Sequence, residues 1–287
     1  MSKKKEIHNQ ALRIPKLIIY TAKLLEFISP KLATFFAAKL FTTPIKHKIP
    51  KREHQMDSES EQTNVFVPTI NKDIIIYHYG KSDRKILLVH GWSGRGTQLV
   101  KIADELLKLG FSTLSFDAPA HGKSKGKTTL IPEFIASILE IEKQFGPFEF
   151  AIGHSLGGMS ILNAINSGLM VKKAVTIGAA DIIQDIIDDF VSKLKLKPTL
   201  GITLRDHFEH KFNVEMDSYS ASRAAKSVAI PILIIHDATD DDVNVSSAHH
   251  IHKNLENSEI IITEGLGHRK ILGNDAVIKN IIKFIKT

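Results

Sequence analysis

Gly153-His154-Ser155-Leu156-Gly157 is the stretch of sequence that decides the fold. It follows the apolar run 148–152 and leads into residues 158–165, which we expect to be helical. A serine between two glycines at such a strand-to-helix turn is typical of a nucleophile elbow, which exposes the serine hydroxyl. Strand and helix nearly touch at this turn, so side chains at the two glycine positions would collide. The motif makes Ser155 the candidate nucleophile.

A serine nucleophile needs a base that takes its proton and an acid that orients the base. Four aspartates follow the strand predicted at 230–236. We favour Asp240 as the acid, because the stretch from His236 to Val243 resembles the His-Gly-x-x-Asp-x-x-Val pattern of the α/β-hydrolases, with Asp237 at its glycine position. We interpret the other three aspartates as solvent-exposed carboxylates or helix N-terminal charges. They are Asp237, Asp241 and Asp242.

The candidate base is His268, in a glycine-framed loop after the strand predicted at 258–263. The chain has 14 histidines, so position along the chain, and not residue type, singles out His268. His249, His250 and His252 resemble a metal cluster. They lie on a predicted helix, however, and lack a second ligand group at zinc spacing. We therefore expect no bound metal and no organic cofactor.

Acyl transfer also needs N–H donors aimed at the oxyanion that forms on the carbonyl oxygen. A buried strand predicted at 85–90 runs into His90, Gly91 and Trp92. The candidate oxyanion hole consists of the backbone N–H groups of Trp92 and of Leu156, the residue after the nucleophile. Alternatively, the Trp92 side chain only packs in the core or forms part of a pocket wall.

These motifs, in this order, resemble the α/β-hydrolase superfamily over roughly residues 63–287. A further stretch, Phe116 to Ser124, resembles the Asp-x-x-Gly-x-Gly-x-Ser loop of that family, with Ala120 at one glycine position. The resemblance implies an α/β fold with a mostly parallel eight-stranded sheet, helices on both faces and a small helical lid. A serine at the elbow argues against the dehalogenases and epoxide hydrolases of this family, which use a carboxylate there.

The hydrophobic pattern alternates strands and helices, as a parallel sheet covered on both faces requires. Two opening strands are predicted to form an antiparallel edge. Strands are predicted near 64–69, 73–79, 85–90, 111–116, 148–152, 172–177, 230–236 and 258–263, and helices near 96–109, 130–145, 156–168, 245–255 and 274–286. The stretch from about 180 to 226 lacks a strand, and 181–196 is helical in pattern. We interpret this insertion as the lid over Ser155.

The chain matches neither of two common nucleotide-binding motifs. Gly122 to Thr128 resembles a phosphate-binding loop, but three residues separate its glycines where four are required. No G-x-G-x-x-G follows the first strand, so dinucleotide binding is unsupported. We interpret Gly122 to Thr128 as a basic surface loop.

Charge is concentrated near the start of the chain. Residues 1–53 hold 12 Lys and Arg against three Glu, whereas the formal net charge of the whole chain is +7. The remainder is close to neutral, which argues against nucleic acid binding. We predict that residues 1–62 form a basic amphipathic helical arm and a polar linker, and that 63–287 form the catalytic domain. The arm, residues 1 to about 52, is expected either to pack on the body or to bind a membrane surface.

The sequence thus predicts a serine hydrolase that cleaves carboxylic esters with an apolar acyl or alcohol part. A thioesterase, acyltransferase or peptidase with the same residues stays open, as does a non-catalytic membrane-peripheral role. Cysteine is absent, which suits a reducing compartment, so we expect a cytoplasmic location or association with a membrane.

Overall fold

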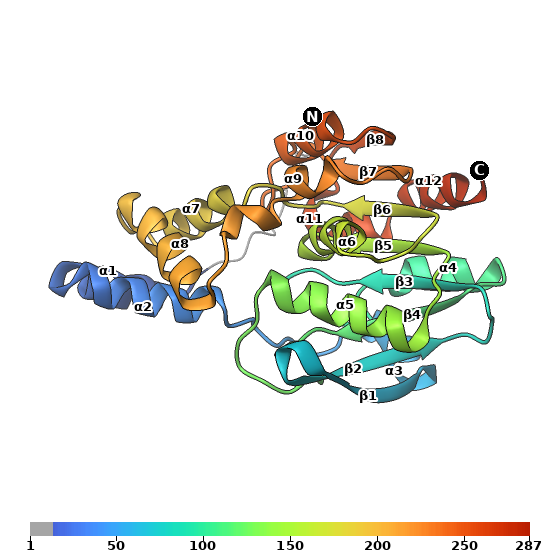
Figure 1. Ribbon diagram of the computed structural model, residues 1–287, viewed down its shortest axis with the longest axis horizontal. Helices are drawn as coiled ribbons and strands as arrows, with labels where there is room; N and C mark the ends of the chain where they lie inside the picture. Colours follow the sequence, from blue (N-terminus) through green and yellow to red (C-terminus); the bar gives the residue numbers. More distant parts are fainter. Residues whose placement is uncertain (1–13) are drawn as a thin grey trace, which may run out of the picture.

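The computed structural model describes residues 14–287, which build one eight-stranded sheet (Figure 1). Its strand order is β1-β2-β4-β3-β5-β6-β7-β8. The strands are β1 (Glu61–Val67), β2 (Lys72–Tyr79), β3 (Lys85–Val89), β4 (Ser112–Asp117), β5 (Phe150–His154), β6 (Lys173–Ile177), β7 (Ile232–Asp237) and β8 (Ser258–Thr263). β1 and β2 pair antiparallel, as do β2 and β4, and every other pair is parallel. The predicted fold class, with its antiparallel edge, is confirmed.

Helices cover both faces of this sheet because its central strands are apolar on both sides. Every residue of β4, β5 and β7 is buried, as expected for strands inside a parallel sheet. One face carries α4 (Val100–Lys108) and α12 (Asp275–Lys286). The other face carries α5 (Ile131–Phe145), α6 (Leu156–Asn166), α9 (Ala221–Ala225) and α10 (Ser246–Asn254).

The predicted insertion lies between β6 and β7. It contains α7 (Ile183–Lys193) and α8 (Thr199–Phe212), followed by a 3₁₀ turn, Met216–Tyr219. The first of these helices was expected from the sequence, whereas α8 was not, although its buried Leu200, Leu204 and Phe208 recur at four-residue steps. We call α7 and α8 the cap helices. They project beyond the sheet at one end of the molecule (Figure 1).

Two helices near the start of the chain, α1 (Lys16–Ile28) and α2 (Pro30–Phe41), join the cap helices (Figure 1). Pro30 ends α1 and begins α2, a position where its missing N–H costs nothing. Phe41 packs its ring 5.2 Å from that of Phe190 on α7 and 5.4 Å from that of Phe208 on α8. The predicted arm therefore contacts the cap through α2. Its residues 1–13 lie outside the described part of the chain.

The segment predicted as a polar linker, 52–62, is folded, so that prediction is wrong. It forms a 3₁₀ turn, Lys51–Glu53, and α3 (His54–Glu59), and it enters β1 at Glu61. The Glu53 carboxylate is buried and accepts hydrogen bonds from Arg95 at 3.0 Å and Thr97 at 2.8 Å. Its charge is thereby satisfied inside the protein, which anchors this segment on the body.

Candidate active site

Ser155 stands at the sharp turn between β5 and α6, with φ 53° and ψ −123°. Positive φ is rare outside glycine and marks a strained backbone, often at a functional site. A Cβ on Gly153 would lie 2.5 Å from the Gly157 carbonyl, and one on Gly157 would collide with the Val89 carbonyl. The collisions predicted from the sequence are confirmed. This turn has the geometry of a nucleophile elbow.

His268 and Asp240 form a direct pair. His268 lies on the short helix α11 (Gly267–Lys270), and its Nδ1 is 2.7 Å from Oδ2 of Asp240. The carboxylate side chain is 1% exposed and the imidazole 7%. Because a carboxylate only accepts hydrogen bonds, Nδ1 carries the proton and Nε2 is left free to accept one. Asp240 thus orients His268 as a proton acceptor.

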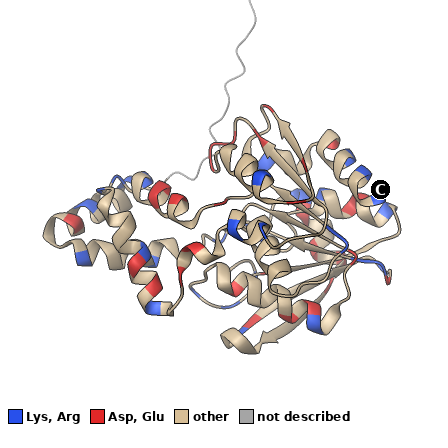
Figure 2. Cartoon of the chain, turned by 45° about the horizontal axis from the view of Figure 1, so that its top comes forward, with Lys and Arg blue, Asp and Glu red and all other residues tan. Residues whose placement is uncertain are grey.

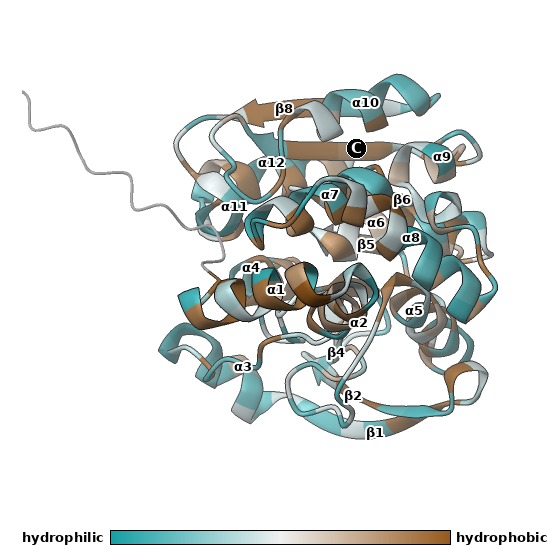
Figure 3. Cartoon of the chain, turned by 90° about the vertical axis from the view of Figure 1, so that its left-hand side faces the viewer, coloured by the Kyte–Doolittle hydropathy of each residue, from teal (hydrophilic) through white to brown (hydrophobic). Residues whose placement is uncertain are grey.

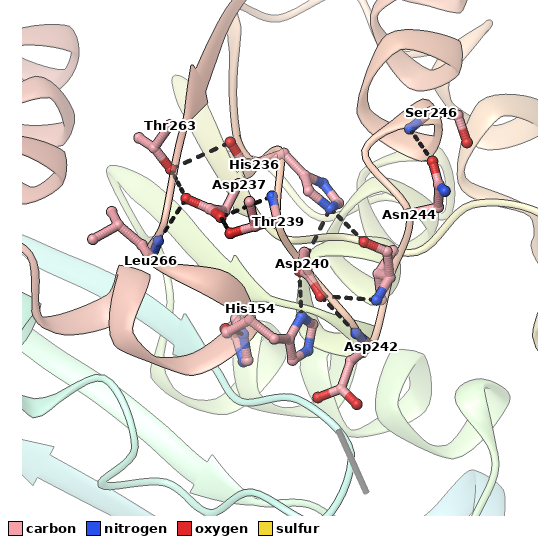
Figure 4. Close-up of polar contacts among 12 residues, drawn as sticks. His154, His236, Asp237, Thr239, Asp240, Asp242, Asn244, Ser246, Thr263 and Leu266 are labelled. Atoms are coloured by element: carbon pink, nitrogen blue, oxygen red, sulfur yellow. Dashed lines mark hydrogen bonds and ion pairs between the residues drawn. The ribbon is translucent and has the colours of Figure 1, made fainter. Parts of the chain in front are cut away.

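Several donors hold the Asp240 carboxylate in place (Figure 4). Its Oδ1 accepts hydrogen bonds from the backbone N–H groups of Asp242 at 2.8 Å and Val243 at 2.9 Å. Burial by itself would raise the pKa of Asp240, but the hydrogen bond and charge of His268, with these two N–H groups, lower it below its ordinary value. Asp240 is therefore ionised at neutral pH.

His236, at the end of β7, is a residue of this site that the sequence reasoning missed. Its Nε2 lies 2.9 Å from the Val243 carbonyl oxygen and 3.5 Å from Oδ2 of Asp240. Since a carbonyl only accepts, Nε2 carries the proton and donates it to Val243, beside the Asp240 carboxylate. The signal in the sequence was a histidine at a strand end, four residues before the candidate acid.

Asp237 is buried, so its interpretation as a solvent-exposed carboxylate is wrong. It accepts hydrogen bonds from Thr263 Oγ1 at 2.7 Å, Leu266 N at 3.0 Å and Thr239 Oγ1 at 2.6 Å (Figure 4). Burial would raise the pKa of Asp237, yet these donors lower it well below its usual range. Asp237 joins the loop of Asp240 to the loop before His268 and does not touch the base.

The other two aspartates of this loop differ in their surroundings. Asp241 is exposed, as the sequence interpretation expected. Asp242 is half-buried and forms an ion pair of 3.1 Å with Arg269, the residue after the base. The pair gives the acid loop a further contact with α11.

The predicted oxyanion loop lies against the elbow. A Cβ on Gly91 would lie 2.9 Å from Cβ of Ser155, so no side chain fits between this loop and the nucleophile. The neighbouring N–H groups of Gly91 and Ser93 are engaged by side chains. Those of Trp92 and Leu156 donate to no acceptor within residues 14–287. The two predicted donors thus remain available to a bound oxyanion.

Two buried histidines hold this loop. Ala118 N donates to His90 Nε2, and Ser93 N donates to His121 Nε2, both at 3.0 Å. Burial lowers the pKa of His90 to about 4, and burial together with His90 lowers that of His121 to about 3. Both rings are neutral at neutral pH, which lets each Nε2 accept. Ser93 Oγ also accepts a hydrogen bond of 2.9 Å from Ile45 N, in the segment after α2.

The structure brings Asp240 to His268, and it brings the Trp92 loop to Ser155. Within the described residues, no hydrogen bond joins the Ser155 hydroxyl to the His268 ring. Hydrogen bonds between nucleophile and base are often long without substrate and tighten once it binds. The His268 ring lies 4.6 Å from that of His154, the residue directly before the nucleophile.

The three histidines of α10 have different partners. His250 Nδ1 bonds the Asp181 carboxylate, and His252 Nδ1 lies 2.7 Å from Ser258 Oγ, whereas His249 is exposed. In the part of the chain that the structure describes, no three His, Asp or Glu side chains are grouped to hold a metal.

A hollow of about 600 Å³ lies on the cap helices and is lined by Asp188, Val191, Ser192, Lys195, Leu196, Pro198, Thr199 and Ile202. None of the candidate catalytic residues lines it.

Similar proteins share this architecture. Solved structures of similar fold include an esterase from Exiguobacterium antarcticum, with 17% identity over 79% of this chain and 100% of the esterase, at a TM-score of 0.63. An esterase from Pyrococcus furiosus has 18% identity over 85% of this chain and 97% of its own, at a TM-score of 0.64. A bromoperoxidase from Bacillus anthracis has 15% identity over 79% of this chain and 99% of its own, at a TM-score of 0.60. At these identities the likeness concerns the fold alone.

None of the curated proteins compared with the chain matches it. Comparison with family models, in contrast, gives a specific result. The model of the alpha/beta hydrolase family matches residues 86–277, which include the elbow, the acid and the base. That span is well over half of the chain, and its sheet order agrees with the predicted fold. The chain belongs to the alpha/beta hydrolase family.

Proposed function

We propose that this protein is a serine hydrolase that cleaves carboxylic esters through an acyl-enzyme. The observation that carries the proposal is the buried pair of Asp240 and His268, 2.7 Å apart, beside a strained elbow that presents Ser155. Esterases occur among the proteins of similar fold, which agrees with this chemistry. The proposal assigns Ser155 as nucleophile, His268 as base and Asp240 as the orienting acid.

The reaction follows from the protonation states at the site. Ser155 Oγ attacks the ester carbonyl carbon while its proton passes to Nε2 of His268. The Trp92 and Leu156 N–H groups stabilise the oxyanion, and Asp240 stabilises the imidazolium. His268 then gives its proton to the departing alcohol oxygen, which leaves the acyl group on Ser155. Water, deprotonated by the same imidazole, hydrolyses the acyl-enzyme and releases the acid.

An apolar acyl or alcohol group suits the surroundings of the nucleophile. The side chains of Trp92 and Leu156, on the two segments that flank Ser155, are apolar and partly exposed. Burying such surface against an apolar substrate contributes about 25 cal/mol per Å². Thioesters, amides and acyl transfer use the same residues, so leaving-group preference has to be measured.

Labelling with a fluorophosphonate probe tests the proposal directly. The probe should form a covalent bond with Ser155, located by mass spectrometry of the digested protein, and Ser155→Ala should abolish labelling. Ser160 provides a matched control, since it is a buried serine on α6 whose hydroxyl bonds the Leu156 carbonyl. Ser160→Ala should keep the label. Labelling elsewhere, or none, would refute the assignment.

A panel of matched ester, thioester and amide substrates then separates the related activities. We expect the largest kcat/KM for esters, and expect Ser155→Ala to lower it by about 10⁴-fold or more. Preference for thioesters or amides would move the function to the thioesterases or peptidases. No turnover of any of them by a protein that takes the label would favour an acyltransferase.

A further inference from the structure

The arm helices leave several large apolar side chains uncovered. Seven large apolar side chains of α1 and of the first turns of α2 are exposed, from 46% at Leu32 to 89% at Phe27. They are Leu17, Tyr20, Leu24, Phe27, Ile28, Leu32 and Phe35. We call these seven residues the arm face. In Figure 3, hydrophobic segments of α1 lie on the side of the molecule turned toward the viewer.

The arm face is separate from the side of α1 that packs inside the protein. Ala22 is fully buried, and Ile18 and Leu25 pack against the core from the same side of the helix. The 3- and 4-residue spacing of Leu17, Tyr20, Leu24, Phe27 and Ile28 places them together on another side. The apolar pattern that predicted one amphipathic face therefore belongs to two faces. Packing within residues 14–287 accounts only for the face that carries Ile18, Ala22 and Leu25.

Lysines border the arm face. Helical geometry puts Lys16 and Lys23 next to Phe27 at one edge, and both are exposed. Lys31 and Lys39 are exposed on α2. The one acidic residue of these two helices, Glu26, accepts a hydrogen bond from Lys197 N of the cap. Figure 2 marks the positions of basic and acidic residues along the helices that project from the sheet.

An apolar helix face with a basic edge is the pattern that lies on an anionic bilayer. Lysine stems can lie along the apolar surface while their ammonium groups meet lipid phosphates. A second copy of this chain fits less well, because a symmetric contact through the arm face would bring like-charged lysine edges together. None of the helices between residues 14 and 287 has both the length and the hydropathy of a membrane span.

We propose that the arm face is a docking surface for an anionic membrane, with α1 lying in the plane of the lipid headgroups. The same arm contacts the cap helices through α2, and the segment after it donates from Ile45 N to Ser93, in the candidate oxyanion loop. Docking therefore holds both the cap and this loop near the lipid. The proposal does not depend on the catalytic assignment, because it concerns binding alone.

Flotation of the full chain with vesicles tests the docking surface. Vesicles of phosphatidylcholine with phosphatidylserine should bind the protein at low salt, and phosphatidylcholine alone should bind it much less. Binding should weaken as salt screens the charges. Phe27→Glu should weaken it by roughly tenfold or more. The double variant Lys16→Gln, Lys23→Gln should weaken it by about fivefold per lysine.

Met170→Glu is the matched control. Met170 is 74% exposed and precedes β6, at the opposite end of that strand from the candidate site, so its variant should bind like the wild type. Because Phe27 is 89% exposed, Phe27→Glu should unfold at the wild-type temperature and keep its activity on a soluble ester. No binding by the wild type at low salt would overturn the proposal, as would equal binding by Phe27→Glu. Self-association of the wild type would also overturn the proposal if Phe27→Glu abolished it and vesicles did not affect it.

Discussion

His154 Nε2 donates a hydrogen bond of 2.8 Å to the backbone carbonyl oxygen of His268. Both residues are buried, and their rings lie 4.6 Å apart. Burial, helped by the charge that His268 can carry, lowers the pKa of His154 well below its ordinary value, so its ring is neutral. His154 directly precedes Ser155. The bond therefore ties the backbone of the candidate base to the elbow that carries the candidate nucleophile.

Removing this bond should slow the reaction while Ser155 and Asp240 stay intact. His154→Leu should lower kcat/KM on an ester by about 10- to 100-fold, because a displacement of the base of about 1 Å is enough for such a loss. His154→Gln keeps an N–H donor and should retain more activity. Both variants are compared by steady-state kinetics and thermal unfolding. A folded His154→Leu variant with wild-type kcat/KM would contradict this positioning role.

The acid loop allows a comparison between two buried aspartates. Asp240→Asn should lower kcat by about 10⁴-fold, because the amide no longer selects the productive tautomer of His268 or stabilises its cation. Asp237→Asn should chiefly lower thermal stability, since its carboxylate receives bonds from Thr263 and Leu266 and not from the base. Kinetics and unfolding of both variants separate the two roles.

Asp241→Asn is the control for that comparison, because Asp241 is exposed in the same loop. It should leave both kcat and the unfolding temperature near wild-type values. A loss of kcat in Asp237→Asn as large as in Asp240→Asn, at unchanged stability, would move the orienting role to Asp237.

The parts of the fold that were predictable are those encoded by local patterns. The apolar runs around Ile86, Ile152 and Ile234 predicted central strands, because strands buried on both faces carry apolar residues on both sides. The elbow was predictable because its motif is local: Gly153 is required by contact with Gly157, four residues on, although Gly157 is required by the distant Val89 carbonyl. Ala120 stands where the Asp-x-x-Gly-x-Gly-x-Ser loop of the family has a glycine. Its φ of 66° lies in the left-handed region that favours glycine.

The parts that were not predictable depend on contacts between distant segments. Asp237 is polar and stands among exposed-looking aspartates, and its burial depends on donors that come from Thr263 and Leu266. Glu53 looks like a linker residue until Arg95 is placed beside it. The division of α1 into two apolar faces follows from its packing against α2. A single sequence states the residue types at these positions but not their partners.

The buried histidines predict a loss of stability in acid. His90 and His121 have pKa values of about 4 and 3 in the folded state, below the ordinary value of 6.5. Below pH 6.5 the unfolded chain binds protons that the folded state does not, so the free energy of unfolding falls as pH falls. At pH 5 the loss is up to about 2 kcal/mol for each histidine.

Urea unfolding at pH 7 and pH 5 measures this effect. His121→Gln removes one of the two groups and should lose less stability between these pH values than the wild type, although its stability at pH 7 is lower. His249→Gln changes an exposed histidine and should follow the wild type. The same pH dependence in His121→Gln and in the wild type would show that His121 is not protonated on unfolding.

The buried ion pair between Glu53 and Arg95 predicts that residues 51–59 are needed for the stability of the body. Glu53→Ala leaves the Arg95 guanidinium, whose side chain is 10% exposed, without its carboxylate. Breaking such a pair costs about 3–5 kcal/mol, whereas replacing both partners by apolar residues of similar volume is often neutral. Glu53→Met with Arg95→Met should therefore recover most of the free energy of unfolding lost in Glu53→Ala. Glu59→Ala, at an exposed position six residues on, should change it by less than about 0.5 kcal/mol. Equal stability of Glu53→Ala and Glu59→Ala in urea would show that the ion pair does not stabilise the fold.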